Sequence, residues 1–216
     1  MAKPSLTADR RAAIAARKAE PRTIADLNAA LDLCRACPLW KNATQGVGGE
    51  GGARASVMLV GEQPGDKEDL AGRPFVGPAG RVLDDALGEA GVARREAFIT
   101  NAVKHFKNEP RGKRRLHKRP NAGEVQACKW WLDREVKLVR PKVIVALGAT
   151  AMLSLAKYRG AIGAVRGKAM AGPEGATLVA TVHPSSLLRE PDAAARREKI
   201  KAFVADLKTA RGVLGA

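Results

Sequence analysis

Two short segments hold the side chains best suited to chemistry. The first reads GEQPGDKED (residues 61–69), and the second reads TVHPSSLLR (residues 181–189). Two glycines and a proline in the first segment permit a tight loop in which backbone N–H groups approach a ligand closely. No Gly-Lys-Ser/Thr follows, so this is not a Walker loop, and hydrolysis of nucleoside triphosphates is disfavoured. Its acids Glu62 and Asp66 are either functional carboxylates or solvated loop charges.

The second segment combines a histidine with groups that can hold phosphate. His183 precedes a proline turn, and Ser185, Ser186 and Arg189 follow within six residues. Small hydroxyls, backbone N–H groups and a guanidinium together suit a phosphate oxygen. A lone histidine is more often structural than functional. The neighbours of His183 favour the functional interpretation.

The three cysteines point to metal binding or inert burial. Cys34 and Cys37 form a C-x2-C pair, the spacing of half a zinc or iron–sulfur site, and a second half is required elsewhere. An odd number of cysteines without a secretory signal argues against a disulfide framework.

The charge balance indicates a polyanionic partner. Lysine and arginine number 38 against 22 aspartates and glutamates, a formal net charge of +16. Such an excess suits nucleic acid first and anionic membrane a distant second. Aromatic residues are only 4% of the chain, so a platform that stacks many bases is poorly supplied. No apolar run of about 18 residues exists, so we expect no membrane span and a cytoplasmic protein.

The elements that must position these residues alternate between strand and helix. Apolar runs predict buried strands at Val57–Val60, Ala97–Thr100, Val143–Leu147 and Leu178–Val182. Predicted helices cover Ile24–Leu33, Pro78–Ala90, Ala122–Val139 and Asp192–Leu207, and one more opens at Gly148. Residues 46–52 and the basic segment 104–119 are expected to be loops.

This order predicts an α/β fold, a three-layer α/β/α sandwich with a four-stranded parallel sheet. Residues 1–22 are expected to be a basic extension, and residues 23–216 one domain. Ligands of such sheets collect at the carboxyl ends of the strands, which here carry residues 61–66, Asn101, Gly148 and His183.

Together, GEQPGDKED and TVHPSSLLR resemble the uracil-DNA glycosylase superfamily, and most closely its iron–sulfur family 4. The resemblance runs from about Cys34 to Leu207. It implies a four-stranded parallel sheet flanked by helices, in agreement with the pattern above.

The resemblance also implies roles for single residues. Glu62 and Gln63 match the catalytic motif that handles the attacking water, with Gln63 and Asp66 expected at the uracil. Phe75, in GRPFVGPAG, matches the aromatic residue on which extruded uracil stacks, and Asn101 matches the amide that reads the uracil edge. His183 matches the histidine that donates a hydrogen bond as negative charge builds on the leaving base.

The same resemblance implies a metal centre. Related enzymes supply its second half with a cysteine after the asparagine strand and another on the next helix. Cys128 provides the helical ligand, whereas His105 stands where the other cysteine is expected. The implied cofactor is a [4Fe-4S] cluster with a structural role, held by Cys34, Cys37, His105 and Cys128. Zinc would accept the same four ligands.

A further likeness concerns the segment Lys113-Arg114-Arg115-Leu116-His117, which is similar to the KRRIH loop of the UdgX branch of the superfamily. That branch also carries GEQPG. The likeness implies that, after uracil leaves, His117 bonds covalently to the sugar and the protein stays on the DNA after one turnover. The basic residues Lys113, Arg114 and Arg115 would grip phosphates.

Chemistry makes this capture intelligible. Loss of the base leaves an oxocarbenium-like sugar, and a positioned neutral imidazole is a stronger nucleophile for its C1′ than water. Glu62 could accept a hydrogen bond from the other ring nitrogen. Extruding a base costs less from single-stranded DNA, so uracil-containing single strands are the expected substrate of a monomeric protein.

Two alternatives stay open. The first is a conventional multiple-turnover uracil-DNA glycosylase of base excision repair in which His117 only contacts phosphate. The second is a non-enzymatic iron–sulfur module that binds DNA through its charge. The joint presence of Glu62, Phe75, Asn101 and His183 argues against the second.

Overall fold

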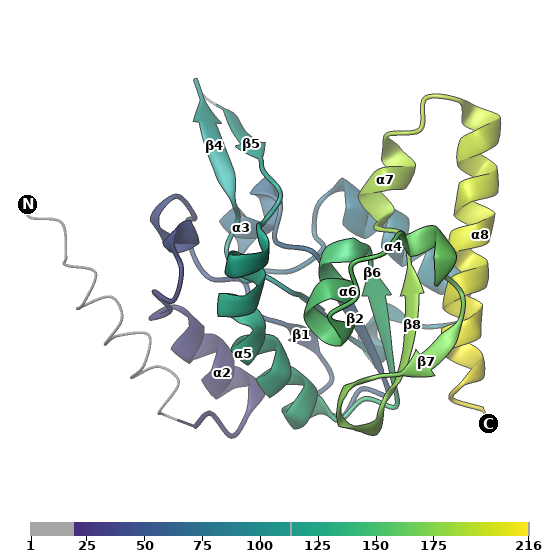
Figure 1. Ribbon diagram of the computed structural model, residues 1–216, viewed down its shortest axis with the longest axis horizontal. Coiled ribbons are helices and arrows are strands. Elements are labelled where there is room, and N and C mark those ends of the chain that lie inside the picture. The colour runs from purple at the N-terminus through teal and green to yellow at the C-terminus, as the bar shows by residue number, and fades with distance from the viewer. Residues whose placement is uncertain (1–19, 113, 216) are drawn as a thin grey trace, which may run out of the picture.

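A central sheet organises the computed structural model, which describes residues 20–112 and 114–215 (Figure 1). Its four inner strands run parallel: β2 (Val57–Gly61), β3 (Ala97–Asn101), β6 (Val143–Leu147) and β8 (Thr177–Thr181). All residues of these strands except Thr177 are buried, as expected for parallel strands covered on both faces. The predicted parallel sheet is therefore confirmed, with strand limits displaced by at most one residue.

Two short antiparallel edge strands extend the sheet to six, in the order β1-β3-β2-β6-β8-β7. Strand β1 (Glu50–Gly51) pairs with β3 inside the segment predicted to be a loop, and β7 (Ala169–Ala171) pairs with β8. A Cβ on Gly51 would lie 2.2 Å from the carbonyl oxygen of Ala97. The close approach of β1 to β3 therefore requires glycine at this position.

Helices cover both faces of the sheet and complete the predicted sandwich. On one face, α4 (Pro78–Glu89) and α8 (Ala193–Gly212) pack through Leu83, Leu87 and Phe203. On the other face lie α5 (Ala122–Val139) and α6 (Ala149–Ala156), with α2 (Ile24–Leu31) packed against α5. Alternate residues of each strand face opposite helical layers, so two separate cores form. Within the described residues, no helix is long and apolar enough to cross a membrane.

Helix limits follow the capping residues. Helix α5 begins after a capping box of Asn121 and Glu124 and spans the predicted residues. Helix α8 continues five residues beyond its predicted end. The helices α3 (Asp66–Ala71) and α7 (Pro184–Leu188) were not predicted, because a helix of five or six residues carries no readable period. Single 3₁₀ turns cover Pro38–Lys41, Arg94–Glu96, Ile162–Ala164 and Pro173–Gly175.

The basic segment 104–119 is not wholly a loop. It contains an antiparallel hairpin of β4 (Asn108–Arg111) and β5 (Arg114–His117), which projects from the body of the molecule (Figure 1). Its register pairs Asn108 with His117. The loop prediction was wrong because these strands consist mainly of charged and polar residues, without the apolar alternation by which a strand is recognised.

Candidate active site

A cavity of about 1010 Å³ opens at the carboxyl ends of the parallel strands. It brings together most of the predicted site residues, from segments more than 120 positions apart. These are Glu62, Gln63, Asp66, Phe75, Asn101, His117, His183, Ser185, Ser186 and Arg189. These residues meet at the edge of the sheet where ligands of α/β folds collect.

The deepest part of the cavity is built from buried residues of the sheet edge. Asn101 ends β3 and is 2% exposed, and Phe75 is 5% exposed. Gly61 ends the neighbouring strand, where a Cβ would lie 2.3 Å from Asn101 Oδ1 and 2.6 Å from Phe75 Cζ. Glycine is thus required for the amide and the ring to share this floor. Phe75 also adopts a φ of +54°, an uncommon backbone conformation that concentrates at functional sites.

His183 lines the cavity next to Phe75. Its ring stacks on Phe75 with centroids 5.8 Å apart, and it occupies the N-cap of α7. Burial above all, together with the charges of His117 and Arg189, lowers the pKa of His183 to about 4. The imidazole is therefore neutral near pH 7. Because Nδ1 accepts a hydrogen bond from the backbone N–H of Ser185, the ring proton is assigned to Nε2. That nitrogen can donate to a ligand.

The side chains of Glu62 and His117 approach each other at the rim. Glu62 Oε1 lies 3.6 Å from His117 Nε2, and Glu62 Oε2 lies 3.7 Å from Arg119 Nε. The hydroxyl of Thr150 donates a 2.6 Å hydrogen bond to Oε2. The side chain of His117 is 51% exposed, so a ligand in the cavity can reach its ring. An imidazole, a carboxylate and a guanidinium thus lie close together at the rim.

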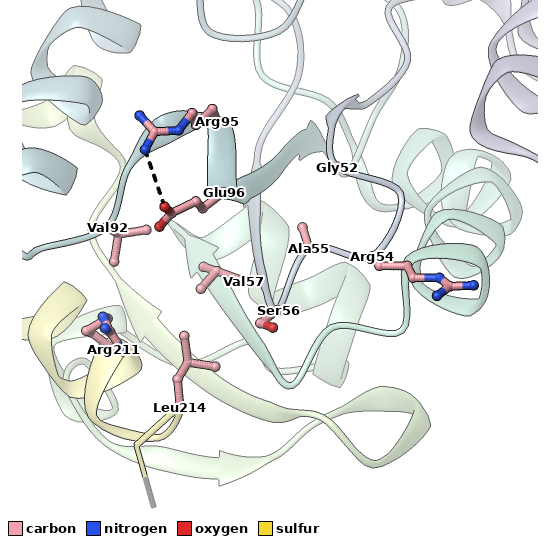
Figure 2. A pocket seen from close by; sticks show the side chains of 10 residues that line it. All are labelled: Gly52, Arg54, Ala55, Ser56, Val57, Val92, Arg95, Glu96, Arg211 and Leu214. Atoms are coloured by element: carbon pink, nitrogen blue, oxygen red, sulfur yellow. Dashed lines mark ion pairs between the residues drawn. The ribbon is translucent and has the colours of Figure 1, made fainter.

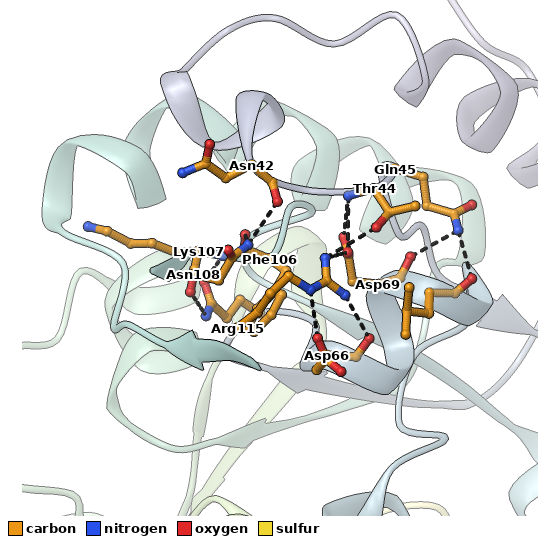
Figure 3. A network of polar contacts seen from close by, with 11 residues as sticks. Asn42, Thr44, Gln45, Asp66, Asp69, Phe106, Lys107, Asn108 and Arg115 are labelled. Atoms are coloured by element: carbon orange, nitrogen blue, oxygen red, sulfur yellow. Dashed lines mark hydrogen bonds and ion pairs between the residues drawn. The ribbon is translucent and has the colours of Figure 1, made fainter. Parts of the chain in front are cut away.

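An ionic anchor holds the hairpin that carries His117 (Figure 3). Arg115 Nε lies 2.7 Å from Asp66 Oδ1, and its Nη1 lies 2.5 Å from Asp69 Oδ2. Asp69 is fully buried and also accepts the backbone N–H of Thr44. Arg115 was expected to grip phosphate and Asp66 to bind uracil. Both side chains fasten the hairpin to α3, and the roles expected for them stay predictions.

Gln63 closes the base of the same hairpin. Its Oε1 accepts the N–H of Lys107 at 3.1 Å, and its Nε2 donates to the carbonyls of Lys118 (3.1 Å) and Lys107 (3.3 Å). Both ends of the amide therefore bind backbone groups of the two residues that flank the hairpin, one before β4 and one after β5. The role in uracil binding implied for Gln63 stays a prediction, whereas its contacts assign it to hairpin support.

The expected phosphate-binding residues form two groups. Ser185, Ser186 and Arg189 gather on α7 at the rim, where Arg189 Nη1 lies 3.4 Å from the Ser185 hydroxyl. Arg114 is exposed on β5. Lys113 lies outside the described residues. The cations Arg119 and Lys67 also line the cavity but were not assigned to it from the sequence.

The cysteines lie away from the cavity, in an apolar cluster formed by α2, α5 and the segment after β3. Cys34 and Cys128 are buried in one apolar cluster, and Cys37 packs against it. Trp131 Nε1 donates to Cys34 Sγ, and the N–H of Lys104 donates to Cys128 Sγ, both at 3.2 Å. Among the described residues, no three histidine, cysteine or carboxylate side chains are arranged to hold a single metal ion.

The chemistry of these residues nevertheless fits a multi-iron cluster, whose ligands bind separate irons and so stand further apart. Burial raises the pKa of Cys128 to about 12, so this thiol needs a proton or a metal cation on its sulfur. His105 is 4% exposed, and burial, reinforced by the charge of Arg35, lowers its pKa to about 4. It is a neutral imidazole, the form that binds metal. N–H donors to the two sulfurs are typical of iron–sulfur ligands.

A buried ion pair between Lys104 and Glu135 lies between the cysteine cluster and Asn101 of the cavity. Lys104 Nζ lies 2.6 Å from Glu135 Oε2, 2.6 Å from the Thr100 hydroxyl and 2.8 Å from the carbonyl oxygen of Asn101. Both charged side chains are 1% exposed. The sequence showed Lys104 only as one more cation of a basic segment. Its partner on α5 is 31 residues away, and no local signal announces the pair.

A second, smaller hollow of about 490 Å³ lies near the amino end of β2, at the opposite edge of the sheet (Figure 2). Arg54, Arg95 and Arg211 line it, and Arg95 pairs with Glu96 at 3.7 Å. None of the predicted site residues lies there.

Known proteins are similar to this chain in sequence. A model of the uracil DNA glycosylase superfamily matches residues 49–208. The type-4 uracil-DNA glycosylase of Pyrobaculum aerophilum is 41% identical over 165 residues, which cover 73% of this chain and 81% of the relative. The corresponding protein of Thermotoga maritima is 39% identical over 178 residues, covering 79% and 89%. This chain therefore belongs to the uracil-DNA glycosylase superfamily.

Proposed function

We propose that this protein excises uracil from DNA by cleaving the N-glycosidic bond. The observation that carries the proposal is the convergence of Asn101, Phe75 and His183 on the floor of one cavity at the sheet edge. The type-4 relatives bear the name of this activity. Its net charge of +16 suits a DNA substrate.

The floor of the cavity reads and activates the base. The Asn101 amide donates to a uracil carbonyl and accepts from N3–H, a pairing that cytosine does not offer, while Phe75 stacks on the ring. As the C1′–N1 bond breaks, the bonding electrons pass to uracil. His183 Nε2–H donates a hydrogen bond to the resulting anion. A preorganised donor of this kind contributes about 3–4 kcal/mol to transition-state stabilisation.

We further propose that His117 captures the sugar, as in UdgX-type proteins. One imidazole nitrogen attacks the electron-poor C1′ as uracil leaves, and the proton of the other nitrogen passes to Glu62. The 3.6 Å approach of the Glu62 and His117 side chains supports this assignment. After the proton is lost, expulsion of the imidazole would require an unfavourable anion. The adduct is therefore long-lived and the protein acts once.

The proposed cofactor is a structural [4Fe-4S] cluster held by Cys34, Cys37, His105 and Cys128. It would tie the segment after α2 to the segment that follows Asn101. We expect the purified protein to be brown, Cys34→Ala and Cys128→Ala to lose colour and solubility, and His105→Cys to keep the cluster. Absorption spectra and iron analysis test this. Colourless, folded protein with stoichiometric zinc would contradict it.

The proposed substrate is uracil in single-stranded DNA, bound by a monomer that acts at the nucleoid. The exposed cations Lys67, Arg119 and Arg189 line the open cavity, where they can contact phosphates on either side of an extruded base. A single strand is favoured because no base pair must be broken before extrusion, which saves a few kcal/mol.

A denaturing gel tests the activity and separates the alternatives. Wild-type protein is incubated with a uracil-containing oligonucleotide, single- or double-stranded, and with a thymine-containing control. We expect a covalent band only with uracil, and faster with the single strand. Abasic product with turnover and no covalent band would indicate a conventional glycosylase, whereas neither product would indicate a binding module.

A further inference from the structure

We propose that Thr150 is a positioning residue for Glu62, an assignment that rests on the function proposed above. Its hydroxyl donates a 2.6 Å hydrogen bond to Glu62 Oε2, across 88 positions of the chain. Thr150 is 2% exposed, whereas the Glu62 side chain is 21% exposed. The contact therefore runs from a rigid, buried residue to a carboxylate that stands at the cavity.

The fold fixes Thr150 through the turn between β6 and α6. Gly148 has a φ of +93°, donates its N–H to the carbonyl of Thr181 and occupies the N-cap of α6. A Cβ on Gly148 would lie 3.2 Å from His183 Cβ. Glycine thus lets the first turn of α6 approach the loop of His183, and Thr150 is the second residue of that turn. A carboxylate near a helix amino terminus is also stabilised by the helix dipole.

The two oxygens of Glu62 have different partners. Thr150 holds Oε2, and Oε1 faces His117 Nε2 at 3.6 Å. With one oxygen fixed, the carboxylate cannot turn away from the imidazole. A hydroxyl is neutral, so it orients the carboxylate without cancelling the charge that Glu62 needs to accept a proton. Arg119, at 3.7 Å from Oε2, is 66% exposed and offers a weaker, screened contact.

The test compares single-turnover uracil release and adduct formation in variants of α6. Thr150→Val keeps the shape but removes the hydroxyl, and we expect it to slow both steps about 10- to 100-fold. Thr150→Ser restores the donor and should recover most of the rate. Ser154→Ala is the matched control, because Ser154 is a buried α6 hydroxyl that has no hydrogen-bond partner among the described residues. It should leave the rates unchanged.

Two readouts distinguish positioning from a structural role. In a Glu62→Gln background, Thr150→Val should cause no further loss, because its effect passes through the carboxylate. In the presence of the native Glu62, Thr150→Ser should recover the rate that Thr150→Val loses, because it restores the hydroxyl donor to Glu62 Oε2.

Three results would overturn the assignment: full activity of Thr150→Val, equal slowing by Thr150→Ser, or an additive loss in the Glu62→Gln background. Wild-type behaviour judges the proposed function separately. If it releases uracil without forming an adduct, capture fails, and Thr150 is judged on uracil release alone. If it does neither, both proposals fall. Thermal unfolding and affinity for uracil-containing DNA, expected to be unchanged in Thr150→Val, show that the variant is folded.

Discussion

The sheet edge and the β4–β5 hairpin contribute to one cavity but are built in opposite ways. Asn101 and Phe75 are almost fully buried, and the parallel register places Gly61 beside Asn101. His117 is half-exposed, on a hairpin attached to the body mainly through Arg115 and Gln63. Packing of the core thus fixes the residues proposed to read the base, whereas a few polar contacts fix the proposed nucleophile.

This difference indicates that, in the proposed mechanism, recognition of uracil and capture of the sugar can be altered separately. Residues of a packed core cannot move without a large loss of stability. A hairpin held by hydrogen bonds and ion pairs can lose its position while the rest of the fold persists. Substitutions in the hairpin should therefore change the fate of the sugar, whereas substitutions at the sheet edge should change the choice of base.

The largest expected effect is that of His117→Ser. A serine hydroxyl is a much weaker nucleophile at neutral pH and leaves room for water, so the covalent band should vanish while uracil release persists. A denaturing gel and a uracil assay on the same samples measure both. A His117→Ser protein that still forms the adduct would contradict sugar capture by His117. In that case a lysine such as Lys113 or Lys118 would act through a borohydride-trappable imine.

Asn101→Ala should affect uracil release rather than capture of the sugar. Loss of the amide should slow uracil release about 100- to 1000-fold, because one preorganised polar contact to the base is removed. Affinity for undamaged DNA, which depends on phosphate contacts, should stay within about two-fold and should fall steeply with added salt. Filter binding at two salt concentrations provides the comparison. Equal loss of excision and affinity would show that Asn101 is structural.

Gln63→Ala should weaken the attachment of the hairpin and leave the residues of the sheet edge in place. Three hydrogen bonds to Lys107 and Lys118 disappear, so the ratio of adduct to released uracil should fall about ten-fold. Gln45→Ala is the matched control, since its amide binds the carbonyls of Asp69 and Leu70 outside the hairpin. If the two variants give the same ratio, the hairpin does not depend on Gln63.

The smallest effect concerns stability at low pH. Burial lowers the pKa of folded His183 to about 4 from its usual 6.5. Between these values the unfolded chain binds the proton and the folded protein does not, so the free energy of unfolding falls as pH drops from 6.5 to 4. His183→Gln should reduce the loss between pH 7 and pH 5 by about 1–2 kcal/mol, measured by urea unfolding. Equal losses in the two proteins would place His183 in contact with solvent.

The parts predicted from the sequence are those with local signals. Strands β2 and β6 are apolar runs, β3 begins with three apolar residues, and α5 begins at a capping box. Because the four inner strands are parallel, their order along the chain was enough to bring Asn101 and His183 to one edge.

The unpredicted parts depend on contacts between distant residues. The hairpin has no apolar alternation and is held by Asp69, 46 positions from Arg115. Thr150 and Lys104 gain their roles from partners 88 and 31 positions away. Nothing near a threonine or lysine in the chain reports such a partner, so these roles appear only when the fold is known.

Mass spectrometry of the crosslinked peptide tests the central claim most directly. The wild-type adduct on a uracil-containing single strand would be digested with nuclease and protease. The account predicts a deoxyribose phosphate on His117, attached through an imidazole nitrogen and resistant to borohydride. A modification on any other residue, or recovery of the peptide with an unmodified His117 from the purified adduct, would contradict it.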